Sequence, residues 1–389
     1  MLYLDHAAST PVRPEARAAV AAWLTETGTD VLGNPSAGHA AGRAARVAVE
    51  RAREQVAAAV GASPADVVFT SGGTEADNLA VKGLAWAGAE ADRRHLVISA
   101  VEHAAVRNPA RWLTGHGFTL TEVDPTSEGR VDVEAVLDAV TDRTAMVSIM
   151  TANNEVGTCN DVAALAAALV DRPAVLHSDA IQAVATRDVR LVEGLDAMSV
   201  SGHKFGAPQG VGAAVLRRGV GIEPLLHGGG QDRGVRSGTF AAALDAALGA
   251  GIEAAVADRH RVAATSRAQT DRIRAAAAAM DGVHVHGARE PDDRLPTHVH
   301  LGCDGVDAEL LTFGLDRAGL CASTGSACAS GAQAASHVVQ ACGIDDDAVL
   351  RLSVGWTTTD DEVDAAIAVL DRVVSQLRSG ASLFDLDVA

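Results

Sequence analysis

The sequence predicts an α/β fold, with a large domain on a mostly parallel mixed sheet and a smaller C-terminal α+β domain. Strand-like apolar runs alternate with helix-like segments as far as residue 218, a pattern typical of a parallel sheet. From about residue 240 the pattern changes to a long Ala-rich helical stretch followed by shorter strands. We expect the large domain at 1–250, with its N-terminal segment packed on the small domain, and the small domain at 251–389.

Each predicted element follows from a short apolar run or a helical periodicity. The large-domain strands are expected at 66–70, 95–100, 145–150, 174–180, 196–204 and 211–218. Helix-like segments or turns follow most of them. Beyond them we expect a helix from 240 to 280, strands in "GVHVHG", "THVHLG" and "VLRLSVG", and a closing amphipathic helix in "DDEVDAAIAVLDRVVSQLRS".

Composition limits the function classes. The chain has 389 residues with 48% apolar and 21% charged content, which is typical of a globular protein. Lys plus Arg is 32 and Asp plus Glu is 50, so the net charge of −18 argues against direct nucleic-acid binding. No basic and apolar leader opens the chain, and no apolar run reaches membrane-spanning length. We therefore expect a cytoplasmic protein.

The cysteines argue against disulfides and metal. The five are Cys159, Cys303, Cys321, Cys328 and Cys342, and no CxxC pair or His cluster has the spacing of metal ligands, so we expect no metal site. Cys328 lies in "STGSACASG" (323–331), whose small residues predict an exposed, mobile loop. Reactive thiols occupy accessible positions, so this residue alone indicates either a functional thiol or an ordinary surface cysteine.

Five further residues or motifs have both a functional and a structural explanation. "SGGTEADN" (71–78) suits a phosphate at a helix N-terminus, or is a plain turn. Lys204 in "SGHKFG" suits a Schiff base with a carbonyl cofactor, or is a surface lysine. Asp179 suits a protonated pyridine nitrogen, or is an N-cap. His103 suits stacking on an aromatic ring, or a structural hydrogen bond. Asn154 suits a ring substituent, or a turn.

These features share one position: each follows a predicted strand, where open α/β sheets bind ligands. A phosphate cradle, a lysine for a Schiff base, a carboxylate for a ring nitrogen and a stacking imidazole together describe a pyridoxal 5′-phosphate site. The combination is much more specific than any one member.

The order of motifs resembles a known family over nearly the whole chain. "YLDHAAST", "GNPS", "SGGTEADN", "EHAAV", "NNEVGT", "HSDAIQA", "SGHKFGAPQGVGA", "HGGGQDRGVRSGT", "STGSACASG" and "LRLSVG" occur in this order. The chain is similar to cysteine desulfurases of the NifS/IscS type, which are class V aminotransferases with the fold-type I architecture of pyridoxal-phosphate enzymes.

The resemblance implies a role for each matching residue. Lys204 would bind the cofactor covalently, and His103 would stack on its ring and relay protons. The phosphate would be bound by Gly73, Thr74, Ser201 and His203. The ring nitrogen and ring hydroxyl would meet Asp179 and Gln182, and Asn154 would contact cofactor or substrate. Thr239 would reach the phosphate of the other subunit of a homodimer. Arg351 and Asn34 would bind the substrate carboxylate.

The implied reaction converts L-cysteine to L-alanine and leaves a persulfide on Cys328 for a sulfur-acceptor protein. Iron–sulfur cluster assembly is the commonest destination in the family, and thio-modification of tRNA, DNA or a metabolite is the alternative. A selenocysteine lyase, or another lyase or aminotransferase of this fold, is a rival. Intact Lys204, His103, Cys328 and Arg351 argue against a non-catalytic scaffold.

Two departures from the family pattern concern the cysteine loop. Cys321 stands seven residues before Cys328, where an aliphatic residue is usual, and we expect it to be a small packing residue, as also for Cys159 and Cys342. "AQAASHVV" lacks a proline before its Ser-His, which leaves open where the loop ends.

Overall fold

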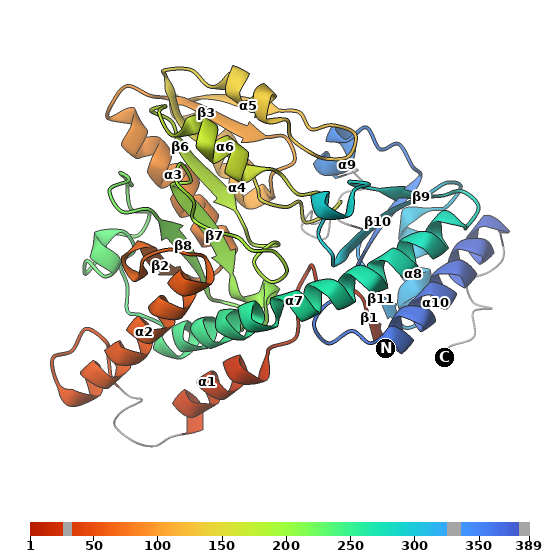
Figure 1. The fold of residues 1–389 in the computed structure, drawn as a ribbon, viewed down its shortest axis with the longest axis horizontal. Coiled ribbons are helices and arrows are strands. Elements are labelled where there is room, and N and C mark those ends of the chain that lie inside the picture. Colours follow the sequence, from red (N-terminus) through yellow and green to blue (C-terminus); the bar gives the residue numbers. More distant parts are fainter. Residues whose placement is uncertain (26–32, 325–335, 381–389) are drawn as a thin grey trace.

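A seven-stranded sheet forms the centre of the large domain (Figure 1). The computed structural model describes residues 1–25, 33–324 and 336–380. The strand order is β2-β8-β7-β6-β5-β3-β4. The strands are β2 (Val67–Thr70), β3 (His95–Ser99), β4 (Thr119–Val123), β5 (Thr144–Ser148), β6 (Val175–Asp179), β7 (Ala197–Ser201) and β8 (Gly212–Leu216). Only β8 is antiparallel to its neighbours, so the other six strands end at one edge of the sheet.

Helices cover both faces of this sheet. They are α1 (Pro14–Thr25), α2 (Ala40–Ala59), α3 (Gly73–Ala89), α4 (Ala104–Thr114), α5 (Val133–Ala139) and α6 (Val162–Leu169). On β3, Leu96 and Ile98 belong to the hydrophobic cluster under α3 and α4, whereas Val97 belongs to the cluster on the other face. Burial on both faces explains why the strands read as continuous apolar runs.

A smaller antiparallel sheet lies in the C-terminal part of the chain. Its order is β12-β10-β9. The strands are β9 (Val283–His286), β10 (His298–Cys303) and β12 (Ala348–Ser353). The helices in this part of the chain are α8 (Ala308–Arg317), α9 (His337–Ala341) and α10 (Asp360–Arg378). The N-terminal strand β1 (Leu2–Tyr3) pairs in parallel with β11 (Leu320–Cys321), and Leu4 joins the core of this sheet. The start of the chain therefore packs on its C-terminal part.

One helix, α7 (Ala242–Ala278), connects the two parts of the fold. Its 37 residues give a length of roughly 55 Å, and Figure 1 shows it running from α1 and α2 to the smaller sheet and α10. Position 250 lies inside this continuous helix. In the described ranges of the chain, no helix combines the length and hydropathy needed to cross a bilayer.

The predicted α/β class is confirmed, and each predicted strand is present within a residue or two at its start. The prediction named no strand at β1, β4 or β11 and no helix at α1, α2, α5, α8 or α9. Strand β4 lies at an edge of the sheet and is only partly buried, and its sequence "TLTEV" includes Glu122. Such a strand has no continuous apolar run for the pattern to detect.

A buried ion pair ties α2 to the edge strand β2. Arg53 Nη2 lies 2.8 Å from Asp232 Oδ1, and Arg53 Nη1 donates to the carbonyl of Val67 at 2.6 Å. The other oxygen of Asp232 accepts from the amide of Phe69 at 3.1 Å. Both charged residues are under a tenth exposed. The pair therefore holds a helix, a strand and the segment around Asp232 together.

We expect Arg53→Ala to lower the free energy of unfolding by about 3–5 kcal/mol, because it leaves the carboxylate of Asp232 buried without its cation. Urea unfolding followed by circular dichroism measures the change. Arg51→Ala, on the exposed face of the same helix, is the matched control and should change stability by under about 0.5 kcal/mol. Equal, small changes in the two variants would contradict this assignment.

Candidate active site

Lys204 lies just beyond the carboxyl end of β7, in the single-turn helix η3 (Gly202–Lys204). Its Nζ donates to the carbonyls of Ala7 at 2.5 Å and Ala8 at 3.0 Å. Gln182, which follows β6, donates from Nε2 to the same Ala7 carbonyl at 3.0 Å. The N-terminal segment thus meets the edge of the large sheet, and two predicted cofactor residues from different strands lie side by side.

Asp179 is the last residue of β6 and is 5% exposed. Its Oδ1 accepts from the amide of Ile181 at 2.9 Å, but turns and not a helix follow at 181–186, so Asp179 is not the helix N-cap of the structural alternative. Burial raises the pKa of Asp179 to about 6, although the Ile181 hydrogen bond and the charge of Lys204 pull it down. A carboxylate this buried is stabilised by a cation, and a protonated ring nitrogen would supply one.

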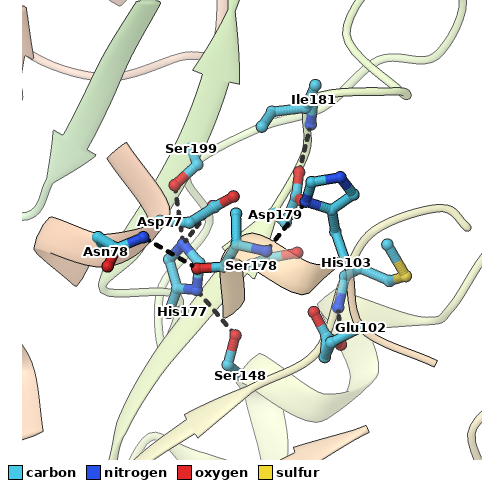
Figure 2. A network of polar contacts seen from close by, with 12 residues as sticks. Asp77, Asn78, Glu102, His103, Ser148, His177, Ser178, Asp179, Ile181 and Ser199 are labelled. Carbon is cyan, nitrogen blue, oxygen red and sulfur yellow. Dashed lines mark hydrogen bonds and ion pairs between the residues drawn. The ribbon is translucent and has the colours of Figure 1, made fainter. Parts of the chain in front are cut away.

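His103 caps the N-terminus of α4 and lies next to Asp179 (Figure 2). Its Nδ1 accepts from the amide of Ala105 at 3.1 Å. The neutral ring therefore carries its proton on Nε2, which is left as the donor for the site. Burial and then the charge of Lys204 lower the pKa of His103, which favours this neutral form. The structural role and the proposed role in proton transfer use different nitrogens of one ring.

The predicted phosphate cradle lies where β2 turns into α3. Gly72 has φ +143°, a value that favours glycine, and Gly73 opens the helix. A Cβ at Gly73 would lie 3.2 Å from the Cβ of Ser201 and 2.4 Å from Cδ1 of Ile181, so the turn fits closely against the end of β7. Thr74 follows in the first helical turn. Free N–H groups here favour an anion.

His203 adds an imidazole to this edge, immediately before Lys204. Its Nδ1 is buried and has no hydrogen-bond partner in the part of the chain that the structure describes, and burial lowers the pKa of His203 to about 4. A buried polar atom without a partner requires an explanation, and a bound anion would provide one. This edge of the sheet thus offers an amine, a buried carboxylate, two imidazoles, hydroxyl groups and a glycine turn. These groups together fit the aldehyde, ring and phosphate of pyridoxal phosphate.

A buried polar network behind Asp179 was not predicted (Figure 2). His177 Nδ1 lies 2.8 Å from Ser148 Oγ, and its Nε2 lies 3.0 Å from Ser199 Oγ and 3.8 Å from Asp77 Oδ1. Burial lowers the pKa of His177 to about 3. Burial and then the charge of Asp179 raise the pKa of Asp77. A neutral His177 and a protonated Asp77 leave the negative charge on Asp179.

His177 and Asp77 both stand in motifs that the sequence analysis singled out. His177 is two positions before Asp179, and Asp77 is three positions after Thr74. Alternation along β6 could have indicated that His177 faces the same side of the sheet as Asp179. The contact with Asp77 depends on how α3 packs on the sheet.

Arg351 lies on β12 and is 3% exposed. Its Nη2 lies 2.8 Å from Asp5 Oδ1, and its Nη1 donates to the carbonyl of Asn154 at 2.8 Å. Nε is buried and has no hydrogen-bond partner among the described residues. Two predicted substrate residues, Arg351 and Asn154, are thus in contact, and Asp5 is a partner that the sequence prediction missed.

Cys328 falls outside the described residues, but the described chain on both sides is anchored near Arg351. Ser323 exchanges two backbone hydrogen bonds with Arg351, at 3.1 and 2.6 Å. Ser336 donates to Glu155 Oε1 at 2.9 Å. Glu155 adjoins Asn154 in the chain, so both anchors lie beside the predicted substrate residues.

The other four cysteines are free thiols. Cys159, Cys303 and Cys342 are buried, and burial raises the pKa of each to about 11. Cys321 is partly buried on β11, and burial raises its pKa as well. These thiols are protonated at neutral pH, in which state they are poor nucleophiles.

Asn34 and Thr239 lie together, apart from the other predicted residues. Both are exposed and line one open surface pocket with Phe240. A different cavity, lined by Lys204, Gln182 and His298, lies at the edge of the sheet, and neither Asn34 nor Thr239 lines it.

Comparison with known proteins agrees with this geometry. The family model described as aminotransferase class-V matches residues 2–366. An IscS-like cysteine desulfurase of Mycobacterium tuberculosis is 43% identical over 391 residues, covering 98% of each chain. A solved NifS-like protein has a TM-score of 0.89 and 30% identity, covering 97% of this chain and 100% of the other.

A further solved structure, SspA in complex with cysteine, has a TM-score of 0.78 and 30% identity, covering 91% of this chain and 99% of the other. The predicted resemblance is therefore confirmed over the full length. The chain belongs to the class V aminotransferases and, within them, to the pyridoxal-phosphate-dependent cysteine desulfurases of the IscS/NifS type.

Proposed function

We propose that Cys328 takes the sulfur of L-cysteine as a persulfide and delivers it to an acceptor protein, while L-alanine is released. One arrangement supports this proposal most. Lys204, Asp179 and His103 meet at one edge of the sheet, and the segment containing Cys328 begins and ends beside Arg351 and Asn154–Glu155. An exposed thiol in a run of small residues can approach the substrate and leave again.

Residues of this chain would hold the cofactor from three sides. The phosphate would meet the N-terminus of α3 at Gly73 and Thr74, together with Ser201 and His203. Asp179 would pair with the ring nitrogen, with the neutral His177 and protonated Asp77 keeping its charge in place. Gln182 would bind the ring hydroxyl. When bound, pyridoxal phosphate supplies an electron sink for bond cleavage at the substrate's carbon atoms.

Arg351 would bind the substrate carboxylate through those N–H groups of its guanidinium that its contacts with Asp5 and Asn154 do not use. Asp5 and the Asn154 carbonyl fix the guanidinium through its two Nη atoms, and no residue in the described part of the chain bonds the buried Nε. A guanidinium that is already fixed loses little side-chain conformational entropy when it binds a carboxylate. His103 would move protons at Nε2, because its Nδ1 is held by the Ala105 amide.

The active unit would be a cytoplasmic homodimer. Asn34 and Thr239 share an exposed pocket that is separate from the cavity at Lys204. In a dimer these residues would complete the site of the partner, Thr239 at the phosphate and Asn34 at the substrate. The acceptor would be a protein with a complementary basic surface, since this chain carries a net charge of −18. We propose iron–sulfur cluster assembly as the destination of the sulfur.

The activity is tested by incubating the holoenzyme with L-cysteine and a reductant and quantifying alanine and sulfide in the same samples. We expect the two products in equal amounts. Formation of 3-mercaptopyruvate without alanine or sulfide would instead identify an aminotransferase, and pyruvate together with sulfide would identify a lyase. Adding candidate acceptors then separates the destinations: sulfur retained on an iron–sulfur scaffold protein supports the proposal, and preferential transfer to a tRNA- or DNA-thiolation enzyme would contradict it. Selenocysteine in place of cysteine tests the lyase alternative.

Asp179→Asn tests the pairing with the ring nitrogen. Because Asn keeps the shape but cannot supply a negative charge, we expect the rate of alanine formation to fall by about 10²-fold or more. The absorbance of the bound cofactor should also respond differently to pH, since its ring nitrogen would no longer be held protonated. Asp188→Asn, at an exposed carboxylate, serves as the control. Unchanged turnover in Asp179→Asn would refute the pairing.

A further inference from the structure

Three potential metal ligands meet at the outer end of the smaller sheet. His284 lies on β9, Asp304 directly follows β10, and Asp346 precedes β12. One donor atom from each lies within 4.8 Å of the other two. His284 Nε2 is 2.9 Å from Asp304 Oδ2 and 3.9 Å from Asp346 Oδ1. The three residues are far apart in the sequence, which is why no ligand spacing indicated them.

Asp346 is held with one oxygen bound and the other free. Its side chain is 7% exposed. Oδ2 accepts from His286 Nε2 at 2.8 Å, which leaves Oδ1 on the side of His284. Gly302 of β10 makes room for the carboxylate, since a Cβ there would lie 2.1 Å from Oδ1. This close approach fixes the carboxylate against the sheet before any ligand arrives.

The turns that carry the two aspartates are tied together. Gly305 donates its amide to Asp347 Oδ2 at 2.6 Å, which joins the turn after β10 to the turn before β12. The Asp304 amide donates to the carbonyl of Gly282, just before β9. The backbone around the three side chains is therefore held by hydrogen bonds from three segments.

A buried histidine continues the cluster inward. His300 of β10 is opposite His286 in the sheet register, and their ring centroids lie 5.7 Å apart. His300 is 0% exposed, and within the described ranges neither of its ring nitrogens has a hydrogen-bond partner. An apolar residue would be the ordinary choice at this core position. A buried imidazole without partners indicates that this face of the sheet is built from histidines for a reason other than packing.

We infer that His284, Asp304 and Asp346 bind a divalent cation of the zinc class, with His286 as the positioning residue for Asp346. Zinc takes imidazole and carboxylate ligands at about 2.0–2.1 Å, which places tetrahedral ligand atoms about 3.3 Å apart. The observed separations of 2.9 and 3.9 Å lie on either side of this value. The imidazole favours a transition metal over magnesium or calcium, which prefer oxygen ligands. Solvent would complete the coordination.

Zinc binding is measured by equilibrium dialysis of the holoenzyme against zinc, followed by elemental analysis. Cys328→Ser is used as the background so that this thiol does not compete, and a phosphine replaces thiol reductants for the same reason. We expect one zinc per chain. Separate His284→Ala, Asp304→Asn and Asp346→Asn changes should each weaken binding at least about 10-fold, and His286→Phe should do so because Asp346 loses its hydrogen bond from His286. His260→Ala, an exposed histidine on α7, should bind as the background does.

Thermal unfolding supplies a second readout that separates binding from folding. Zinc should raise Tm of the background, and this rise should be lost in Asp304→Asn, whose side chain is half exposed and outside the core. Without zinc, Asp304→Asn should have the same Tm as the background. The inference is overturned if the background binds no zinc, if His284→Ala and Asp346→Asn bind it as tightly as the background, or if magnesium raises Tm equally. Neither the three proposed ligands nor His286 belongs to the proposed active site, and the Cys328→Ser background is common to all samples, so desulfurase activity can be present or absent without altering this result.

Discussion

Replacing Lys204 by Ala should reduce the rate of alanine formation by at least about 10³-fold. Lys204 is the amine that the carboxyl end of β7 delivers to the site, within hydrogen-bond distance of two N-terminal carbonyls. Its loss removes both the covalent attachment of the cofactor and an amine that can transfer protons. Single-turnover assays with L-cysteine measure the fall, and cofactor absorbance shows whether the variant still retains the group.

The chain offers a clean control because it contains only two lysines, Lys82 and Lys204. Lys82 lies on α3, with its Nζ 4.8 Å from the centre of the Trp112 ring, and has no proposed role in the reaction. Lys82→Ala should retain its activity. Borohydride reduction of the holoenzyme should fix the cofactor on the peptide containing Lys204. Labelling of the Lys82 peptide, or full turnover by Lys204→Ala, would refute the assignment.

The second large effect concerns Cys328→Ser. We expect alanine formation to fall by at least about 10³-fold, because a serine hydroxyl is a far weaker nucleophile toward the substrate sulfur than a thiolate. Cofactor binding should be unaffected, since none of the groups that would hold the cofactor has changed. A normal absorbance spectrum together with lost turnover would separate this defect from misfolding.

Cys321→Ser provides the comparison. Cys321 is partly buried on β11, and its thiol pKa is raised, so its removal should leave turnover close to that of the parent. An inactive Cys321→Ser together with an active Cys328→Ser would assign the sulfur-accepting role to Cys321 instead. Loss in both variants would point to a relay between the two thiols.

The strands and the central site residues were predictable because both are local. Buried parallel strands are continuous apolar runs, and Lys204, Asp179 and His103 lie at or shortly after the carboxyl ends of three of them. Parallel strands place their carboxyl ends at one edge, so residues far apart in the chain converge without any knowledge of side-chain packing. The reversed strand β8 does not disturb this, because β2 and β7 on either side of it run in the same direction.

Contacts that depend on packing between distant segments were not predictable. Asp5 meets Arg351 only because β1 pairs with β11 and brings the N-terminus beside β12. Asp77 reaches His177 only through the way α3 packs on the sheet. The cluster of His284, Asp304 and Asp346 likewise requires β9 to meet the turn after β10 and the turn before β12. In each case the residue types were visible in the sequence, and the partner was set by tertiary structure.

The central claim, that Cys328 carries the sulfur, is tested most directly by locating the sulfur on the protein. The holoenzyme is treated with one equivalent of L-cysteine without reductant, alkylated at once, digested and analysed by mass spectrometry. The account predicts one additional sulfur atom on the peptide containing Cys328, and none on the peptides containing Cys159, Cys303, Cys321 or Cys342. Release of alanine with the added sulfur on another cysteine, or with no sulfur bound to the protein, would contradict it.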